Sequence, residues 1–270
     1  IEPKAIGDII KKYSVTSKIS DFYLSSTFRP DSDEFKKIEN YKIIELFKKT
    51  NFYTSYLVEN KENNMKFIAK SYSFELSNLL RHEIINFCTE VNIIAQLNHP
   101  TILKLINYIP INFDNQPKPV VIVENYQETL YHVFKTIKKY VIPKWDDTQK
   151  LITMYGIASG MAYLHSHDII HRDLKPNNIY FDENYYPRIS GFHPSRYVSN
   201  EKINRLQGTP AYLAPEVHEN YEYSKSSDVY SFSLIIYEMM TGEKPYYNLT
   251  SPKKIKKCIT MKLNKEEEED

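Results

Sequence analysis

The sequence is poor in glycine and cysteine, and it contains no long apolar run. Only six of its 270 residues are glycine and two are cysteine. No apolar stretch approaches the roughly 20 residues that a membrane-spanning helix needs, so we expect no membrane insertion. Cys88 and Cys258 lack the spacing of metal ligands. We therefore expect reduced thiols, which favour a cytoplasmic protein.

An excess of charge of one sign is also missing. The chain has 35 lysines and arginines against 34 aspartates and glutamates, for a formal net charge of +1. The lysines are scattered among acidic residues, so no basic stripe suggests a nucleic-acid partner. The chain begins with Ile1 instead of methionine, which suggests a piece cut from a longer protein.

The N-terminal part of the sequence reads as an extension followed by a sheet. Residues 1–40 have a mixed polar pattern typical of an extension or linker. Residues 41–126 contain alternating runs that predict antiparallel strands. Between these runs, the segment "SNLLRHEIINFCTEVNIIAQLNHP" has apolar residues at helical spacing and stops at Pro100. We predict a small lobe made of an antiparallel sheet and one main helix.

Residues 127–262 predict a second, mostly helical lobe, and 263–270 an exposed acidic tail. The segment "DDTQKLITMYGIASGMAYLHSH" suggests a helix with an apolar core face. That face consists of Leu151, Met154, Ile157, Ala158, Met161 and Leu164. The segment "SSDVYSFSLIIYEMMTGEKPY" is apolar nearly all round, which predicts a helix buried on all sides. Asp228 is its expected cap and Gly242 its expected end.

The segment "HRDLKPNN", from His171 to Asn178, is the most specific pattern in the chain. It resembles the catalytic loop of the eukaryotic protein-kinase family, in which His-Arg-Asp is followed five residues later by Asn. The resemblance implies an α+β, bilobal fold. It also implies that Asp173 orients a hydroxyl nucleophile and accepts its proton, while the amide oxygen of Asn178 holds a metal. Lys175 resembles the lysine of the serine/threonine-type loop.

The resemblance extends to residues of the small lobe. It implies an ATP site that includes Lys70 of "FIAK", Glu90, Glu124 and Tyr126. ATP and Mg²⁺ are the cofactors it implies. From the residues alone, Lys70 and Glu90 could equally form a structural pair, and Asp173 could serve only to hold its loop in shape.

Three features depart from the family pattern. Lys48, Thr50 and Tyr53 occupy the three positions of the glycine-rich loop, where a side chain obstructs the approach of the backbone to phosphates. In "RISGFHPSR", Gly191 stands where the family has its metal-binding aspartate, which leaves Asn178 as the sole metal ligand. Mg²⁺ prefers anionic oxygen ligands, so turnover should be very low.

The third departure concerns the residues around the adenine base. In the same register, Ser55, Ile68 and Tyr180 take the places of the small or medium aliphatic side chains that usually enclose it. The isoleucine and the tyrosine could fill the pocket.

Together these departures favour a pseudokinase, which needs no cofactor. It would act as a scaffold or allosteric regulator in signalling. Its partner would be a protein, such as an active kinase or another signalling protein, bound around the helix that carries Glu90 and the segment from His193 to Gln207. One alternative is a weakly active serine/threonine kinase with atypical metal and phosphate binding. Another is a nucleotide-binding switch that needs no metal.

Overall fold

A computed structural model describes residues 37–50, 53–75, 78, 81–140, 145–198, 206–249 and 251–266. Most of the predicted extension (1–40) and half of the predicted acidic tail (263–270) lie outside these residues. The chain divides into two compact units. The first contains the described residues up to Asn98 together with Leu103–Tyr126, and the second contains His99–Ile102 with the described residues from Gln127 onward.

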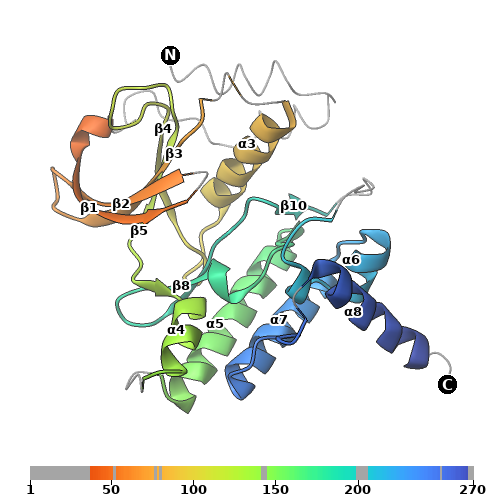
Figure 1. Cartoon of the computed structure of the whole chain (residues 1–270). Coiled ribbons are helices and arrows are strands. Elements are labelled where there is room, and N and C mark those ends of the chain that lie inside the picture. Colours follow the sequence, from red (N-terminus) through yellow and green to blue (C-terminus); the bar gives the residue numbers. More distant parts are fainter. Residues whose placement is uncertain are drawn as a thin grey trace. The chain divides into compact units, whose positions relative to one another are not determined.

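The first unit is a five-stranded sheet with one long helix (Figure 1). Its elements are η1 (Ile38–Asn40), β1 (Tyr41–Lys49), β2 (Tyr53–Asn60), β3 (Lys66–Tyr72), α3 (Arg81–Gln96), β4 (Leu105–Ile109) and β5 (Val120–Glu124). The strand order is β1-β2-β3-β5-β4, and every neighbouring pair is antiparallel. The predicted antiparallel sheet with one main helix is confirmed.

Strand β3 lies at the centre of this sheet and is buried on both faces. Phe67 and Ala69 belong to a core cluster with Val58 and Val120. Because side chains alternate along a strand, Ile68 points to the opposite face, and it is fully buried as well. Lys70 follows two residues later and shares that second face. The alternation therefore directs Lys70 away from the core cluster.

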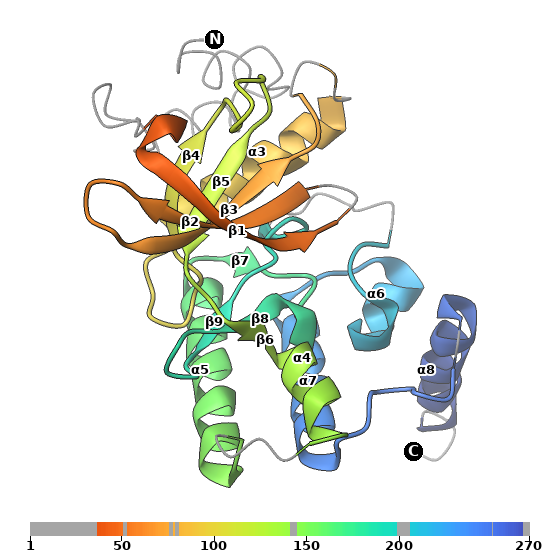
Figure 2. The same cartoon turned by 60° about the vertical axis from the view of Figure 1, so that its left-hand side comes forward.

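The second unit is mostly helical and is shown from another side in Figure 2. Its elements are β6 (Glu128–Thr129), α4 (Leu130–Ile137), α5 (Asp147–Ser166), β7 (Ile169–Ile170), η3 (Pro176–Asn178), β8 (Ile179–Phe181), β9 (Pro187–Ile189), β10 (Arg196–Tyr197), η4 (Pro210–Tyr212), α6 (Pro215–Asn220), α7 (Lys225–Thr241) and α8 (Pro252–Glu266). Strands β6, β8 and β9 form one small sheet and β7 pairs with β10. In the described part of the chain, no helix is both long and apolar enough to cross a membrane.

Helix α5 forms where the sequence predicts a helix, but part of its predicted core face is wrong. Leu151 is 63% exposed, and Ala158 is exposed as well. The buried face instead includes Gly156 and Gly160. A β-carbon at Gly160 would lie 2.7 Å from Ile189 of β9. Because these glycines have no side chains, β9 can approach α5 closely. The spacing of apolar residues in the sequence cannot predict such an approach.

Helix α7 also differs from its prediction. Its N-cap is Ser224, whose side chain accepts a hydrogen bond from the Ser227 N–H, and Asp228 lies inside the helix. Gly242 ends the helix in a left-handed conformation, as predicted. The expected burial on all sides is wrong, because Met240 is 61% exposed. Polar side chains occupy much of the buried face of α7. Their burial is tolerated because each forms a hydrogen bond there.

Candidate active site

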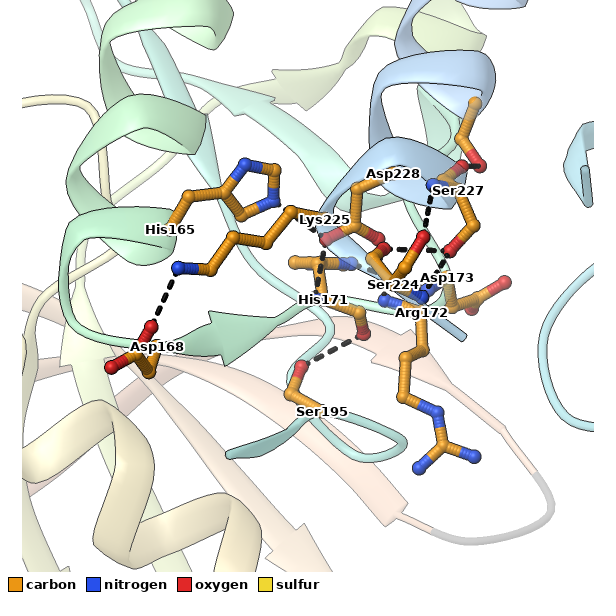
Figure 3. A network of polar contacts seen from close by, with 11 residues as sticks. His165, Asp168, His171, Arg172, Asp173, Ser195, Ser224, Lys225, Ser227 and Asp228 are labelled. Carbon is orange, nitrogen blue, oxygen red and sulfur yellow. Dashed lines mark hydrogen bonds and ion pairs between the residues drawn. The ribbon is translucent and has the colours of Figure 1, made fainter. Parts of the chain in front are cut away.

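Asp228 of α7 holds the backbone at the start of the predicted catalytic loop (Figure 3). Its side chain is 1% exposed. Its carboxylate accepts the N–H of His171 at 2.8 Å and the N–H of Arg172 at 2.9 Å. His165 of α5 lies 3.0 Å from the same carboxylate. Arg172 has a φ of +71°, a conformation that costs free energy in any residue with a side chain. The two hydrogen bonds stabilise this strained turn.

His171 links the loop to the segment that contains Gly191. Its Nε2 lies 2.9 Å from the carbonyl oxygen of Ser190, and its ring packs on Phe192 at 5.2 Å between centroids. Its Nδ1 accepts the N–H of Asp173 at 3.3 Å, so these partners assign the proton to Nε2. Burial lowers the pKa of His171, which keeps the ring neutral. Its role here is structural.

Three side chains surround the Asp173 carboxylate. Lys175 Nζ lies 2.7 Å from Oδ2, and Asn178 Nδ2 donates to the same oxygen at 3.1 Å. Thr209 donates its hydroxyl to Oδ1 at 2.8 Å and accepts from Lys175 Nζ at 2.6 Å. The structure therefore brings Asp173, Lys175 and Asn178 together. Sequence reasoning did not assign Thr209 to this group because it lies 36 residues farther along the chain.

Gly191 leaves a space that the side chain of Asn178 fills. Gly191 has a φ of +83°, and a β-carbon built on it would lie 2.4 Å from Asn178 Cγ and 2.5 Å from Nδ2. The Asn178 amide is held by a second hydrogen bond, to the carbonyl oxygen of Asp173 at 2.7 Å. As the loop stands, position 191 has no room for a carboxylate side chain.

The residues present do not fit the Mg²⁺ that the catalytic loop implies. Within the described ranges, no group of three or more histidine, cysteine, aspartate or glutamate side chains could hold a metal ion. Asn178 turns its amide nitrogen, a donor, toward Asp173. A hard divalent cation instead needs several oxygen ligands, preferably anionic.

In the first unit, Lys70 lies beside Tyr53. The ammonium group is 5.8 Å from the centroid of the Tyr53 ring. Burial lowers the pKa of Lys70, the negative charge of Glu90 opposes this change, and the charge of Lys48 adds to it. Burial also raises the pKa of Tyr53, with a contribution from Glu90. Tyr53, Lys70 and Glu90 are thus electrostatic neighbours, and an aromatic ring lies at a position that the sequence predicts to belong to the glycine-rich loop.

The other two predicted ATP-site residues lie at the end of β5. The Glu124 carboxylate accepts the N–H of Lys104 at 3.0 Å. Tyr126 is 4% exposed, and its ring meets Phe47 of β1 edge to face at 5.2 Å. Tyr126 is therefore packed into the first unit. Phe47 was not predicted to be part of this region, since nothing in the sequence pairs it with Tyr126.

The predicted site residues fall into two groups, one in each unit. Lys70, Glu90, Glu124 and Tyr126 belong to the first unit, and Asp173, Lys175, Asn178 and Gly191 to the second. Of the predicted adenine-side residues, Ser55 and Ile68 are buried in the first unit and Tyr180 is buried in the second.

Comparison with known proteins agrees with this fold and this loop. The family described as "Protein kinase domain" matches residues 49–270. The match covers most of the chain, so the chain belongs to the protein kinase family.

Several curated kinases show the same likeness. A RAC family serine/threonine-protein kinase homolog of Dictyostelium discoideum is 28% identical over 90% of this chain and 54% of its own length. Cysteine-rich receptor-like protein kinase 25 of Arabidopsis thaliana is 37% identical over 58% of the chain and 24% of its own length. For cAMP-dependent protein kinase type 3 of Saccharomyces cerevisiae the identity is 42%, over 40% of the chain and 27% of that kinase. The chain spans about half or less of each relative.

Proposed function

We propose that this protein kinase domain is a pseudokinase, with little or no phosphoryl transfer. The observation that carries the proposal is Gly191. The position of the metal-binding aspartate has no side chain, and Asn178 fills the space that one would need. Removing one preorganised group that stabilises charge costs other enzymes about 10²–10³ in rate. We expect the loss of a charged metal ligand to cost at least as much.

The phosphate side of the first unit supports the same proposal. None of Lys48, Thr50 and Tyr53 is a glycine, and the Tyr53 ring lies next to Lys70. A tyrosine in this place obstructs the close approach of the backbone that a phosphate cradle requires. Each unit thus carries one departure that bears on phosphate or metal binding.

The frame of the catalytic loop is nevertheless intact. Asp228 still holds the backbone of His171 and Arg172, and Asp173 has donors on both carboxylate oxygens. A domain that keeps the conformation of the catalytic loop but lacks the metal-binding aspartate suits a function that depends on binding another protein and not on catalysis. We therefore propose a scaffold or allosteric regulator in cytoplasmic signalling.

Its partner in this proposal is a protein, either an active kinase or another signalling protein. The surfaces involved are those of α3 and of the segment that follows Phe192. Within that segment, Val198 is 49% exposed and Leu206 is 37% exposed. Both side chains are apolar and partly accessible to a partner.

Two other functions each have a specific observation in their favour. The grouping of Asp173, Lys175 and Asn178 favours a weakly active serine/threonine kinase, and the matched relatives carry protein-kinase names. The electrostatic interaction of Lys70 with Glu90 favours a nucleotide-binding switch that needs no metal, in which Lys70 still grips phosphates.

A thermal-shift titration with ATP separates the three functions. It is run without metal, with Mg²⁺ and with Mn²⁺, beside an assay of phosphate transfer to a protein substrate. A ligand at 100 times its Kd stabilises the folded state by about 2.7 kcal/mol. The pseudokinase proposal predicts no such Mg²⁺-dependent stabilisation and no transfer. It is refuted if both appear and the transfer disappears in Asp173→Asn.

The switch predicts a different result. ATP should stabilise the chain equally with and without metal, and the effect should disappear in Lys70→Ala. Lys66→Ala is the matched control, because Lys66 is an exposed lysine of the same strand. If both lysine variants behave like the unaltered chain, the switch is excluded.

A further inference from the structure

Tyr223, between α6 and α7, contacts a segment that precedes it by 16 residues. Its hydroxyl accepts the N–H of Gln207 at 2.6 Å and donates to the carbonyl oxygen of the same residue at 2.7 Å. One side chain therefore satisfies both backbone groups of Gln207. A loop residue outside a helix or sheet has few other means of satisfying them.

The ring of Tyr223 makes a second contact, with Arg172 of the catalytic loop. The Arg172 guanidinium carbon lies 4.2 Å from the ring centroid. Arg172 is 4% exposed, and its Nε and Nη2 have no hydrogen-bond partner among the described residues. Burial lowers the pKa of Arg172 to about 10, and the interaction with Tyr223 opposes this shift. A cation on an aromatic face is stabilised by the ring, and more strongly when the cation is desolvated.

The direction of the Arg172 side chain explains why it depends on Tyr223. In Figure 3 the guanidinium points away from the Asp228 carboxylate that holds its backbone. The charge is thus separated from the nearby acid, and Arg196 lies close enough to repel it. The Tyr223 face is a partner that stabilises the cation in this position.

The two residues after Gln207 also touch the catalytic loop. Gly208 has a φ of +98°, and a β-carbon there would lie 2.5 Å from the carbonyl oxygen of Arg172. Thr209 donates its hydroxyl to Asp173 at 2.8 Å. Gln207, Gly208 and Thr209 are consecutive, so fixing the first restricts where the third can place its hydroxyl.

We propose that Tyr223 is the positioning residue that fastens Gln207–Thr209 to the catalytic loop. Its hydroxyl holds Gln207, its ring holds Arg172, and together they place the Thr209 hydroxyl on Asp173. The proposal goes beyond the pseudokinase function, because the fastening works whether or not phosphate is transferred. It assigns the arrangement of the loop to a residue with no catalytic chemistry of its own.

Amide hydrogen exchange on the full chain tests this proposal. Tyr223→Phe keeps the ring and removes the hydroxyl, whereas Tyr223→Leu removes both. Tyr230→Phe is the matched control, because the Tyr230 hydroxyl pairs with that of Tyr246 at 3.1 Å in the same unit. We expect exchange at Gln207 to rise at least roughly tenfold in Tyr223→Phe, because the substitution removes both hydrogen bonds between the Tyr223 hydroxyl and the Gln207 backbone. Exchange at Thr209 should rise with it.

Two results would overturn the proposal. One is exchange at Gln207 and Thr209 that stays within about twofold of the unaltered chain in Tyr223→Phe, a change smaller than one hydrogen bond produces. The other is an equal rise in Tyr230→Phe, which would make the effect a general loosening of the unit. Tyr223→Leu should give a larger local rise. If that variant fails to fold, the two phenylalanine variants still decide the question.

Discussion

Replacing Gly191 with alanine tests the central feature of the site. The substitution adds only a β-carbon, but that atom would lie 2.4 Å from Asn178 Cγ. Asn178 must move to relieve this contact. Its amide is held by hydrogen bonds to the carbonyl oxygen and to the carboxylate of Asp173. The movement therefore breaks both bonds and frees one side of the catalytic loop.

The expected cost has two parts. A non-glycine residue in the left-handed region costs about 1–2 kcal/mol. Loss of one neutral hydrogen bond and one to a charged group adds about 2–4 kcal/mol. Gly191→Ala should thus lower the free energy of unfolding by about 3–6 kcal/mol, a large fraction of the roughly 5–15 kcal/mol typical of a folded protein.

Urea denaturation of four variants isolates the Asn178 contact: Gly191→Ala, Gly242→Ala, Asn178→Ala, and the double variant of Asn178→Ala with Gly191→Ala. Gly242→Ala is the control, because Gly242 also has a positive φ of +71° but has nothing within 4 Å of an added β-carbon. It should lose only the 1–2 kcal/mol of backbone strain. In an Asn178→Ala background, Gly191→Ala should also cost only that strain. If Gly191→Ala and Gly242→Ala cost the same in the unaltered chain, Asn178 does not fill the space.

Three further predictions concern stability. Gly160→Ala should lower the melting temperature, because its β-carbon would lie 2.6 Å from Thr101 and overpacking costs about 1–3 kcal/mol. The pKa of His171 is lowered in the folded protein, so below pH 6.5 the unfolded chain binds a proton at His171 that the folded chain does not. The free energy of unfolding should therefore fall by up to about 1.4 kcal/mol per pH unit as the pH decreases. Urea denaturation of His171→Phe over the same pH range should show a smaller decrease in this free energy. Burial raises the pKa of Glu238, so the protonated side chain contributes fully to the stability of the fold at a pH below the usual glutamate pKa. This contribution is lost as the pH rises through the raised pKa. In Glu238→Gln, melting temperatures measured from pH 4 to 7 should no longer show that loss of stability.

Much of the fold follows from local patterns in the sequence. The helix that stops before Pro100 and the antiparallel strands within residues 41–126 are predicted correctly, because their periodicity and their breakers are both encoded locally. The left-handed end of α7 at Gly242 is predicted for the same reason. The match of residues 49–270 to the protein kinase family agrees with the short segment from His171 to Asn178.

The incorrect predictions share a different cause. Leu151 on α5 and Met240 on α7 are exposed although both are apolar. The buried face of α5 includes glycines and that of α7 includes Asp228 and Ser231. In α5 a glycine is required because a neighbouring strand approaches closely. In α7 a buried acid is tolerated because its carboxylate accepts hydrogen bonds from backbone N–H groups. Both depend on residues that are distant in the sequence.

The sequence by itself determined the family and the positions of the motif residues, and it predicted that Gly191 stands at the position of an aspartate, since each is a matter of residue type and spacing. The tertiary structure decided what a glycine at position 191 means physically. Asn178 fills the empty space, Thr209 reaches Asp173 from 36 residues away, and Tyr223 holds Arg172. These contacts join segments that are far apart in the chain, and only folding brings them within a few ångströms of one another.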